Sequence, residues 1–195
     1  MKFLDRSNPQ FSENDVKRIA HDLFGLEGNM RSLSSERDQN RCILTESGEG
    51  YVLKIAHLDE AEGVIDFQTK ALQHLEMIDP TLPVPRVVPT LTGEPYTRVT
   101  HPNGEAYLVR VVTYLRGEVV HHAVASNALR ENIGRMMART DLALRGFFHP
   151  NARHELLWDI TQCAHLRPHT CYIPNADARL LVENTLDHFL ERTLP

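Results

Sequence analysis

Lys54 is the residue whose type and position point most directly to chemistry. It lies within the apolar run Tyr51–Ala56, where strand alternation places it on one face with Val52 and Ala56. An ammonium group on an otherwise apolar face needs an anionic partner or a route to water. Two interpretations therefore stay open: a cation that binds phosphate, or an edge-strand lysine that extends outward into solvent.

The next predicted helix offers a polar partner for this lysine. Between Asp59 and Met77 apolar residues recur at three- and four-residue steps, and Gln68 lies within this stripe. A side chain on the stripe faces the sheet, so Gln68 could accept a hydrogen bond from Lys54. Protein kinases hold the α- and β-phosphates of ATP with such a strand lysine opposite a polar group of the following helix. Gln68 is also compatible with a partly buried core amide.

A second group of residues has the side chains of a metal site. Within nine residues of the C-terminal part lie Cys163, His165, His169 and Cys171. Structural zinc sites usually take two ligands from each of two separated segments, and Pro168 would end a helix in the middle of this group. We therefore expect no metal site here, and we interpret Cys163 as a buried helix cysteine and the two histidines as exposed.

Composition and charge exclude several classes of protein. The chain has 195 residues, of which 42% are hydrophobic, and a net charge of −5, which suits a folded core and disfavours a nucleic-acid-binding module. Three cysteines do not read as a disulfide framework. No apolar run reaches the roughly 20 residues of a membrane span, and the N-terminus lacks the apolar run of a signal peptide. We expect a cytoplasmic protein that binds neither nucleic acid nor membrane.

The elements that must position Lys54 and Gln68 follow from periodicity and turn residues. A capping-box-like start at Ser12 opens a helix that should end near Gly25. The further predicted elements are strands at 30–33, 41–45 and 51–56, a helix at 59–77, strands at 86–91 and 106–115, and, after Gly117, three helices near 129–146, 156–168 and 175–189. This order predicts an α+β protein in which one helix packs on a mainly antiparallel five-stranded sheet.

Several segments match one superfamily in order and spacing. They are Leu33-Ser34-Ser35 with Asn40, Tyr51–Ile55, Gln68–Leu75, Leu82–Val88, Val109–Gly117 and Ile133–Ala138. In these segments the chain resembles the aminoglycoside phosphotransferase and choline kinase superfamily, which has a protein-kinase-like fold. His149-Pro150 and Trp158-Asp159 are similar to features of its hydroxylysine kinase-like branch, whose members also occur fused to class III aminotransferases. No single motif is specific, but their order is.

The resemblance implies an organisation and a set of ligands. Residues 1–116 would form a nucleotide-binding N-lobe, and residues 117–195 would form the first helices of a C-lobe. ATP and Mg²⁺ would be the cofactors of the complete protein, and a small molecule with a hydroxyl group its substrate. The residues implied to bind the nucleotide are Lys54, Gln68, Ser34, Ser35, Val112, Thr113 and Leu115.

The implied roles of these residues differ. Lys54 would contact the α- and β-phosphates, which backbone amides around Ser34 and Ser35 would cover. The hinge after the last strand would bind adenine through the Thr113 carbonyl and the Leu115 N–H, with Val112 lining the back of the pocket.

Two departures from the family's pattern matter. Many members carry a glutamate where this chain has Gln68, and a neutral amide adds no opposite charge for Lys54. The family's catalytic loop, His-x-Asp with an Asn five residues after the Asp, and its metal-binding Asp would lie beyond Pro195. We therefore expect no catalytic residue in this chain and no turnover by it alone. It would be a piece of a longer kinase, a truncated gene product or an accessory lobe.

Two functions stay open. The first is the ATP-binding portion of a small-molecule phosphotransferase that phosphorylates a hydroxyl group, with an amino alcohol as the substrate class that the family suggests. The second is a non-catalytic nucleotide-binding or interaction module that regulates or docks a partner such as an attached aminotransferase. The apolar faces of the C-lobe helices also predict a homodimer or a tendency to aggregate.

Overall fold

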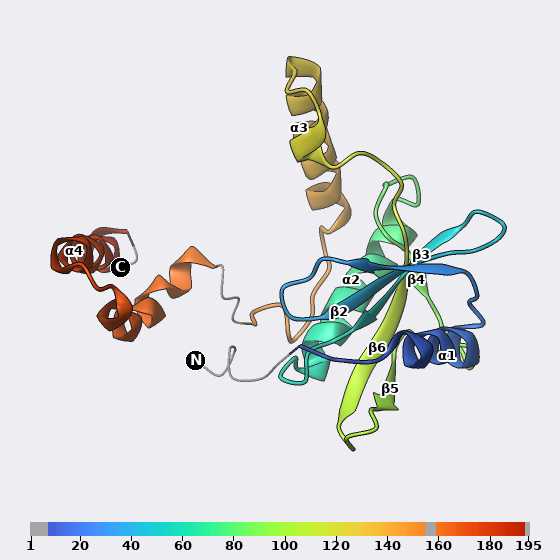
Figure 1. The fold of residues 1–195 in the computed structure, drawn as a ribbon. Coiled ribbons are helices and arrows are strands. Elements are labelled where there is room, and N and C mark those ends of the chain that lie inside the picture. The colour runs from blue at the N-terminus through green and yellow to red at the C-terminus, as the bar shows by residue number, and fades with distance from the viewer. Residues whose placement is uncertain (1–7, 155–158, 194–195) are drawn as a thin grey trace. The chain divides into compact units, whose positions relative to one another are not determined.

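The protein is described by a computed structural model that covers residues 8–154 and 159–193. The chain divides into two compact units, residues 2–152 and residues 153–195, and each is described by itself (Figure 1). The lobe boundary between residues 116 and 117 stays a prediction. The helices are α1 (Glu13–Phe24), α2 (Glu62–Ile78), α3 (Asn127–Ala143) and α4 (Ala176–Arg192), with 3-10 helices η2 (Val120–His122) and η3 (Ile160–Tyr172).

An antiparallel sheet forms the centre of the first unit, which confirms the predicted α+β class. Its strands are β1 (Asn29–Leu33), β2 (Gln39–Leu44), β3 (Gly50–Ile55), β4 (Val87–Val88), β5 (Thr97–Thr100) and β6 (Ala106–Thr113). The strand order is β1-β2-β3-β6-β4, and β5 also pairs with β6. The last strand in the sequence therefore lies beside β3 in the middle of the sheet (Figure 1).

Within the described residues the sheet has six strands, so the predicted number of five was wrong. The additional strand is β5, in a region that we expected to be a loop. Its four residues alternate between half-buried and exposed and pair only with β6, and a strand so short and polar gives little periodic signal. The predicted strand at 86–91 is reduced to two residues because Pro85 and Pro89 flank it and have no N–H to donate.

Different helices cover the two faces of the sheet. On one face, α1 packs Val16 into the main apolar core, which also contains Leu53 of β3. On the other face, Ile65 of α2 packs against Ala56 and Leu108. The prediction of a single packed helix was therefore wrong, since the first helix of the chain also buries its apolar stripe against the sheet.

Local sequence signals account for both ends of α1. The Ser12 hydroxyl accepts a hydrogen bond from the Asp15 N–H at 3.1 Å, as an N-cap residue does. Gly25 adopts a left-handed φ of 65°, and its N–H donates to the His21 carbonyl at 2.9 Å. A residue without a Cβ adopts this conformation at low cost, which is why the helix ends here.

The segment that follows α3 returns to α2 and packs on it. The rings of Phe147 and Phe67 are stacked with centroids 6.0 Å apart. Two residues further, His149 Nε2 lies 2.9 Å from Asp66 Oδ2. α2 is thus held both by the sheet and by residues 147–149, which are far from it in sequence.

The second unit contains η3 and α4. We predicted a helix that ends at Pro168, but η3 is a 3-10 helix that continues past Pro168 to Tyr172. Both Leu166 and Tyr172 are exposed, so no continuous apolar stripe favours an α-helix over this length. The start of the predicted helix, including Trp158, lies outside the described residues. α4 begins after Asn175, as its position in the sequence predicted.

Candidate functional site

Three neighbouring strands place polar side chains in one row on the face that α2 covers. Lys54 of β3 is the register partner of Asn40 in β2 and of Arg110 in β6. Because cross-strand partners point to the same face, Lys54 lies between the two. Asn40 and Arg110 are each only 8% exposed, and 26% of the Lys54 side chain is exposed. A buried face therefore carries two neighbouring cations.

The Lys54 ammonium points toward the connection between β1 and β2. Lys54 Nζ donates a hydrogen bond to Asn40 Oδ1 at 3.3 Å and lies 3.9 Å from Asp38 Oδ2. The other oxygen of Asp38 accepts a hydrogen bond from the His57 N–H at 3.2 Å, which fixes the carboxylate. Ser34 and Ser35 lie in the same connection, the first exposed and the second half-buried.

Gln68 contacts the neighbouring cation instead of Lys54. Its carbonyl oxygen accepts a hydrogen bond from Arg110 Nη2, and the hydroxyl of Thr69 accepts one from Arg110 Nη1 at 3.4 Å. We predicted that Gln68 would face Lys54. The structure differs because the longer Arg110 side chain reaches α2, whereas Asn40 and Asp38 hold the lysine.

Burial disfavours the charge of both cations. Desolvation lowers the pKa of Lys54, and the Arg110 charge lowers it further, while Asp38 raises it. Desolvation likewise lowers the pKa of Arg110, against the opposing effects of Asp38 and Glu60. In both groups the lowering prevails, so the surrounding carboxylates do not fully compensate the buried charge. An added anion would stabilise the charged forms of both side chains.

Two residues beside Lys54, Arg110 and Asp38, were not predicted to belong to the site. The sequence carried a signal for the first of them. Arg110 interrupts an apolar strand between Val109 and Val111, which is the same pattern that identified Lys54. Asp38 gave no such signal, because it is one polar residue among several in a loop. Its position beside Lys54 depends on how the connection folds over the sheet.

At the end of β6, the side chain of Thr113 alters the backbone hydrogen bonding between this strand and Arg86, the residue before β4. The Thr113 N–H donates to the Arg86 carbonyl at 2.9 Å, and the Arg86 N–H donates to the Thr113 hydroxyl at 2.9 Å. In a regular antiparallel pair the Arg86 N–H would donate to the Thr113 carbonyl. The Thr113 hydroxyl therefore accepts the hydrogen bond that the Thr113 carbonyl would otherwise accept.

The residues after Thr113 are hydrogen-bonded to the first residue of β3 and to the turn before it. The Tyr114 N–H donates to the Gly50 carbonyl at 2.8 Å, and Arg116 Nη2 donates to the Gly48 carbonyl. Leu115 between them is exposed. Val112 is buried, and alternation along β6 places it on the same face as Arg110. The predicted hinge residues thus lie at one end of the strip of sheet, formed by β3 and β6, that carries Lys54 and Arg110.

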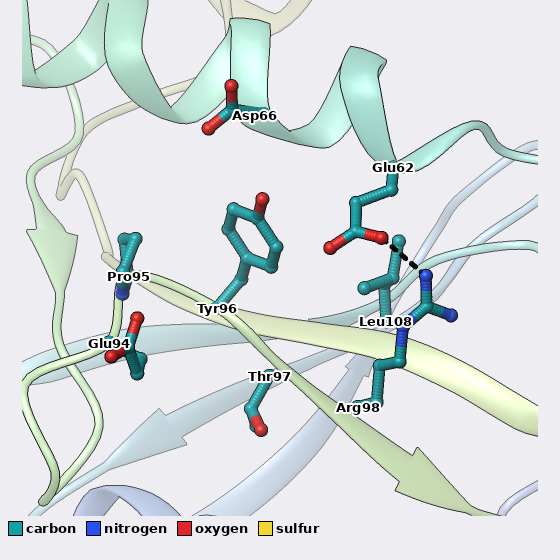
Figure 2. Close-up of a pocket in the computed structure, with 8 residues that line it drawn as sticks. All are labelled: Glu62, Asp66, Glu94, Pro95, Tyr96, Thr97, Arg98 and Leu108. Carbon is teal, nitrogen blue, oxygen red and sulfur yellow. Dashed lines mark hydrogen bonds and ion pairs between the residues drawn. The ribbon is translucent and has the colours of Figure 1, made fainter.

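A separate hollow of about 410 Å³ lies between α2 and β5, and Figure 2 shows the residues that line it. Two of its acidic groups already have partners. Glu62 accepts a hydrogen bond from Arg98 at 2.5 Å, and Asp66 accepts one from Lys70 at 2.8 Å. Tyr96 points its hydroxyl toward α2, and burial raises its pKa, with smaller contributions from Asp66 and Glu62. We assign no ligand to this hollow.

Within residues 8–154 and 159–193, no group of three or more His, Cys, Asp or Glu side chains is placed to hold a metal ion. Of the four residues considered above, Cys163 is half-buried, while His165, His169 and Cys171 are exposed. In the same part of the chain no helix is both long and apolar enough to cross a bilayer.

Comparison with known proteins places the chain among phosphotransferases. The family model described as "Phosphotransferase enzyme family" matches residues 29–194. Hydroxylysine kinase of Danio rerio is 27% identical over 199 residues, an alignment that covers 97% of this chain and 56% of that protein. For hydroxylysine kinase of Xenopus laevis the identity is 26% over 208 residues, with 98% and 55% covered. The chain spans about half the length of these curated relatives.

Two solved structures share the fold. An amicoumacin kinase in complex with AMP-PNP, Ca²⁺ and Ami superimposes with a TM-score of 0.71 and 16% identity, covering 94% of this chain and 54% of that one. A microcompartment-associated aminopropanol kinase gives a TM-score of 0.60 and 16% identity, covering 82% and 49%. These likenesses confirm the protein-kinase-like fold that the order of the sequence segments predicted.

Proposed function

We propose that this chain, which belongs to the phosphotransferase enzyme family, binds ATP along the sheet face that carries Lys54. The observation that supports this proposal best is the environment of the Lys54 ammonium. It is largely buried, it lies beside a second buried cation, Arg110, and its pKa is lowered despite Asp38. Two cations whose charge is incompletely compensated favour a polyanionic ligand such as a triphosphate.

The proposed ligand would lie along the strip from Lys54 to the hinge. The phosphates would contact Lys54 and the backbone amides near Ser34 and Ser35. Adenine would use the Thr113 carbonyl, which lacks its usual ladder partner, and the Leu115 N–H. Thr113 lies three residues beyond Arg110, or about 10 Å along the strand, a separation suited to the adenosine part of an extended nucleotide.

For the complete protein we propose transfer of the γ-phosphoryl group to a hydroxyl of a small molecule that also carries an amine. The names of the relatives support this substrate class, since hydroxylysine and aminopropanol are both amino alcohols. Mg²⁺ bound to the phosphates would neutralise charge that develops during transfer. Within residues 1–195 no His-x-Asp is followed by an Asn five residues after the Asp, so we propose that turnover requires groups that this chain does not supply. We also propose a cytoplasmic location, where ATP is abundant.

Thermal unfolding with and without Mg-ATP tests the nucleotide proposal. At a ligand concentration of about 100 times Kd, binding adds about 2.7 kcal/mol, which raises Tm of a chain of this size by roughly 5–10 °C. We expect this rise for the unmodified chain and for Lys17→Ala, a matched change at an exposed lysine that pairs with Glu13. Lys54→Ala should show little or no rise. No rise in any of the three proteins, or an equal rise in all, would contradict the proposal.

The alternative function is a non-catalytic module that binds nucleotide or docks a partner such as an aminotransferase. It differs from the first proposal in what the whole protein does with ATP. We would supply hydroxylysine and 1-amino-2-propanol with γ-labelled ATP and measure transfer of label to the amino alcohol. Nucleotide binding without transfer by the whole protein would favour the module.

We further propose that a second copy of the chain covers the exposed face of α4. Leu180 and Leu181 on this helix are 56% and 68% exposed, and exposed apolar side chains grouped in this way favour association. Light scattering across a wide concentration range should give a dimer mass for the unmodified chain and a monomer mass for Leu181→Glu. A monomer in both cases would contradict this proposal.

A further inference from the structure

We infer that Arg110, rather than Lys54, is the residue that positions α2 on the sheet, and that Lys54 instead takes its carboxylate partner from Asp38 in the β1–β2 connection. In protein kinases a single ion pair between the strand lysine and a helix glutamate both positions the helix and gives the lysine its carboxylate partner. Here the two attachments involve different residues on neighbouring strands. The inference concerns the protein without ligand and does not depend on the proposed function.

The contacts of Arg110 are those of a residue that joins two elements. Its side chain leaves the central strand β6, is buried, and donates through two nitrogens to consecutive residues of α2, Gln68 and Thr69. Thr69 itself is 1% exposed. A guanidinium is planar and carries several donors in fixed directions, so it restrains the rotation as well as the distance of the helix that it binds.

The contacts of Lys54 lead to a different element. Its ammonium meets Asn40 on the neighbouring strand and Asp38 in the connection before it. Asp38 in turn is fixed by the backbone N–H of His57, just beyond the end of β3. Lys54 therefore fastens the β1–β2 connection to the sheet.

The neutral side chain of Gln68 fits this division. A glutamate at this position would attract Arg110 and Lys54 alike, because the two cations lie side by side. Glutamine offers Arg110 an acceptor without an opposite charge that would draw the lysine away from Asp38. If ATP binds as proposed above, Lys54 can exchange Asp38 for a phosphate while α2 stays attached to β6.

Hydrogen–deuterium exchange of the full chain without nucleotide tests the inference, because local opening of α2 sets the exchange rate of its amides. Loss of a hydrogen bond to a buried charged group should speed this exchange about tenfold or more. We expect this increase in the amides of residues 62–78 for Arg110→Met and for Gln68→Leu. Lys54→Met and Asp38→Asn, which remove the other attachment, should leave α2 exchange close to that of the unmodified chain.

Two further measurements of exchange distinguish a role of Arg110 in positioning α2 from a general loss of stability. Gln68→Glu keeps an acceptor for Arg110 and should keep α2 protected, whereas Gln68→Leu should not. The amides of α1, on the opposite face of the sheet, serve as an internal reference. Equal acceleration in α1 and α2, or acceleration of α2 by Lys54→Met as large as by Arg110→Met, would overturn the inference. Failure of ATP binding would leave these exchange rates unaffected, so the two proposals fail independently.

Discussion

The imidazole of His149 lies 2.9 Å from the carboxylate of Asp66, although 83 residues of chain separate them. The same carboxylate accepts a hydrogen bond from Lys70, one turn further along α2, at 2.8 Å. Asp66 thus joins its own helix to the segment that follows α3. The side chain of His149 is 6% exposed and that of Asp66 is 26% exposed, so this contact is better shielded from solvent than an ordinary surface pair.

Asp66→Asn should reduce stability in a pH-dependent manner. The Lys70 hydrogen bond, and after it that of His149, lowers the pKa of Asp66 below 3.8. A carboxyl group whose pKa is lower in the folded state stabilises the protein above its unfolded pKa, and this contribution is lost as pH falls through the folded value. Near neutral pH we expect Asp66→Asn to cost about 0.5–1 kcal/mol, and the cost should disappear in acid below pH 3.8.

Urea unfolding at a series of pH values measures this difference. Asp141→Asn provides the control, because Asp141 is an exposed aspartate of α3 and its replacement should change little at any pH. A deficit for Asp66→Asn that persists undiminished in acid would show that the carboxylate charge is not what stabilises the contact.

Lys54 should have a pKa below the ordinary value of a lysine. Desolvation and the neighbouring Arg110 lower it, and Asp38 opposes them, so Asp38→Asn should lower it further and Arg110→Met should raise it. The chain has only four lysines, Lys2, Lys17, Lys54 and Lys70, which makes each one separable by mass spectrometry. Competitive acetylation over pH 7–11, read peptide by peptide, gives the pKa of each amine. A pKa of Lys54 that is not lowered, and that neither substitution changes, would contradict the described environment.

Thr113→Val should weaken ATP binding with little loss of stability. Without the hydroxyl, the Arg86 N–H has the Thr113 carbonyl as its nearest acceptor, and an intramolecular hydrogen bond would then compete with adenine for that carbonyl. A neutral hydrogen bond contributes about 1 kcal/mol, so we expect Kd to rise about fivefold. Isothermal titration with Mg-ATP measures this change. Thr113→Ser keeps the hydroxyl and should bind like the unmodified chain; equal weakening in both variants would point to packing instead.

Leu53→Ala should destabilise the protein strongly without altering the Lys54 face. Leu53 is fully buried on the α1 side of β3, and truncation of such a leucine typically costs about 2–5 kcal/mol. Leu91→Ala is the matched control, since Leu91 is 68% exposed, and it should cost far less. Because Leu53 points away from Lys54, the increase in Tm caused by Mg-ATP should persist in the Leu53→Ala variant. Its loss would show that the two faces of the sheet are coupled.

Sequence patterns predicted the elements whose signals are local. The cap at Ser12 and the left-handed Gly25 define α1 because both act within one turn of the helix. The position of Lys54 on a strand face with Val52 follows from alternation alone. The family resemblance then predicted the protein-kinase-like fold, which the likeness to the amicoumacin kinase structure confirmed.

The partners of the candidate site residues could not be predicted in the same way. Whether Gln68 meets Lys54 or Arg110 depends on the rotation of α2 and on the lengths of two side chains from adjacent strands. Asp38 reaches Lys54 because the β1–β2 connection folds over the sheet, and the His57 N–H holds its carboxylate there. Such choices are decided by tertiary packing, and neither periodicity nor spacing carries information about them.

The attachment of α2 on two sides has a mechanical consequence. On the sheet side the helix is fastened through Arg110, and elsewhere on its surface through Phe147 and His149. A displacement of α2 along its axis or around it would strain both sets of contacts at once. Residues 147–149 lie near the end of the first unit, so a shift of this helix would displace that segment of the same unit with it.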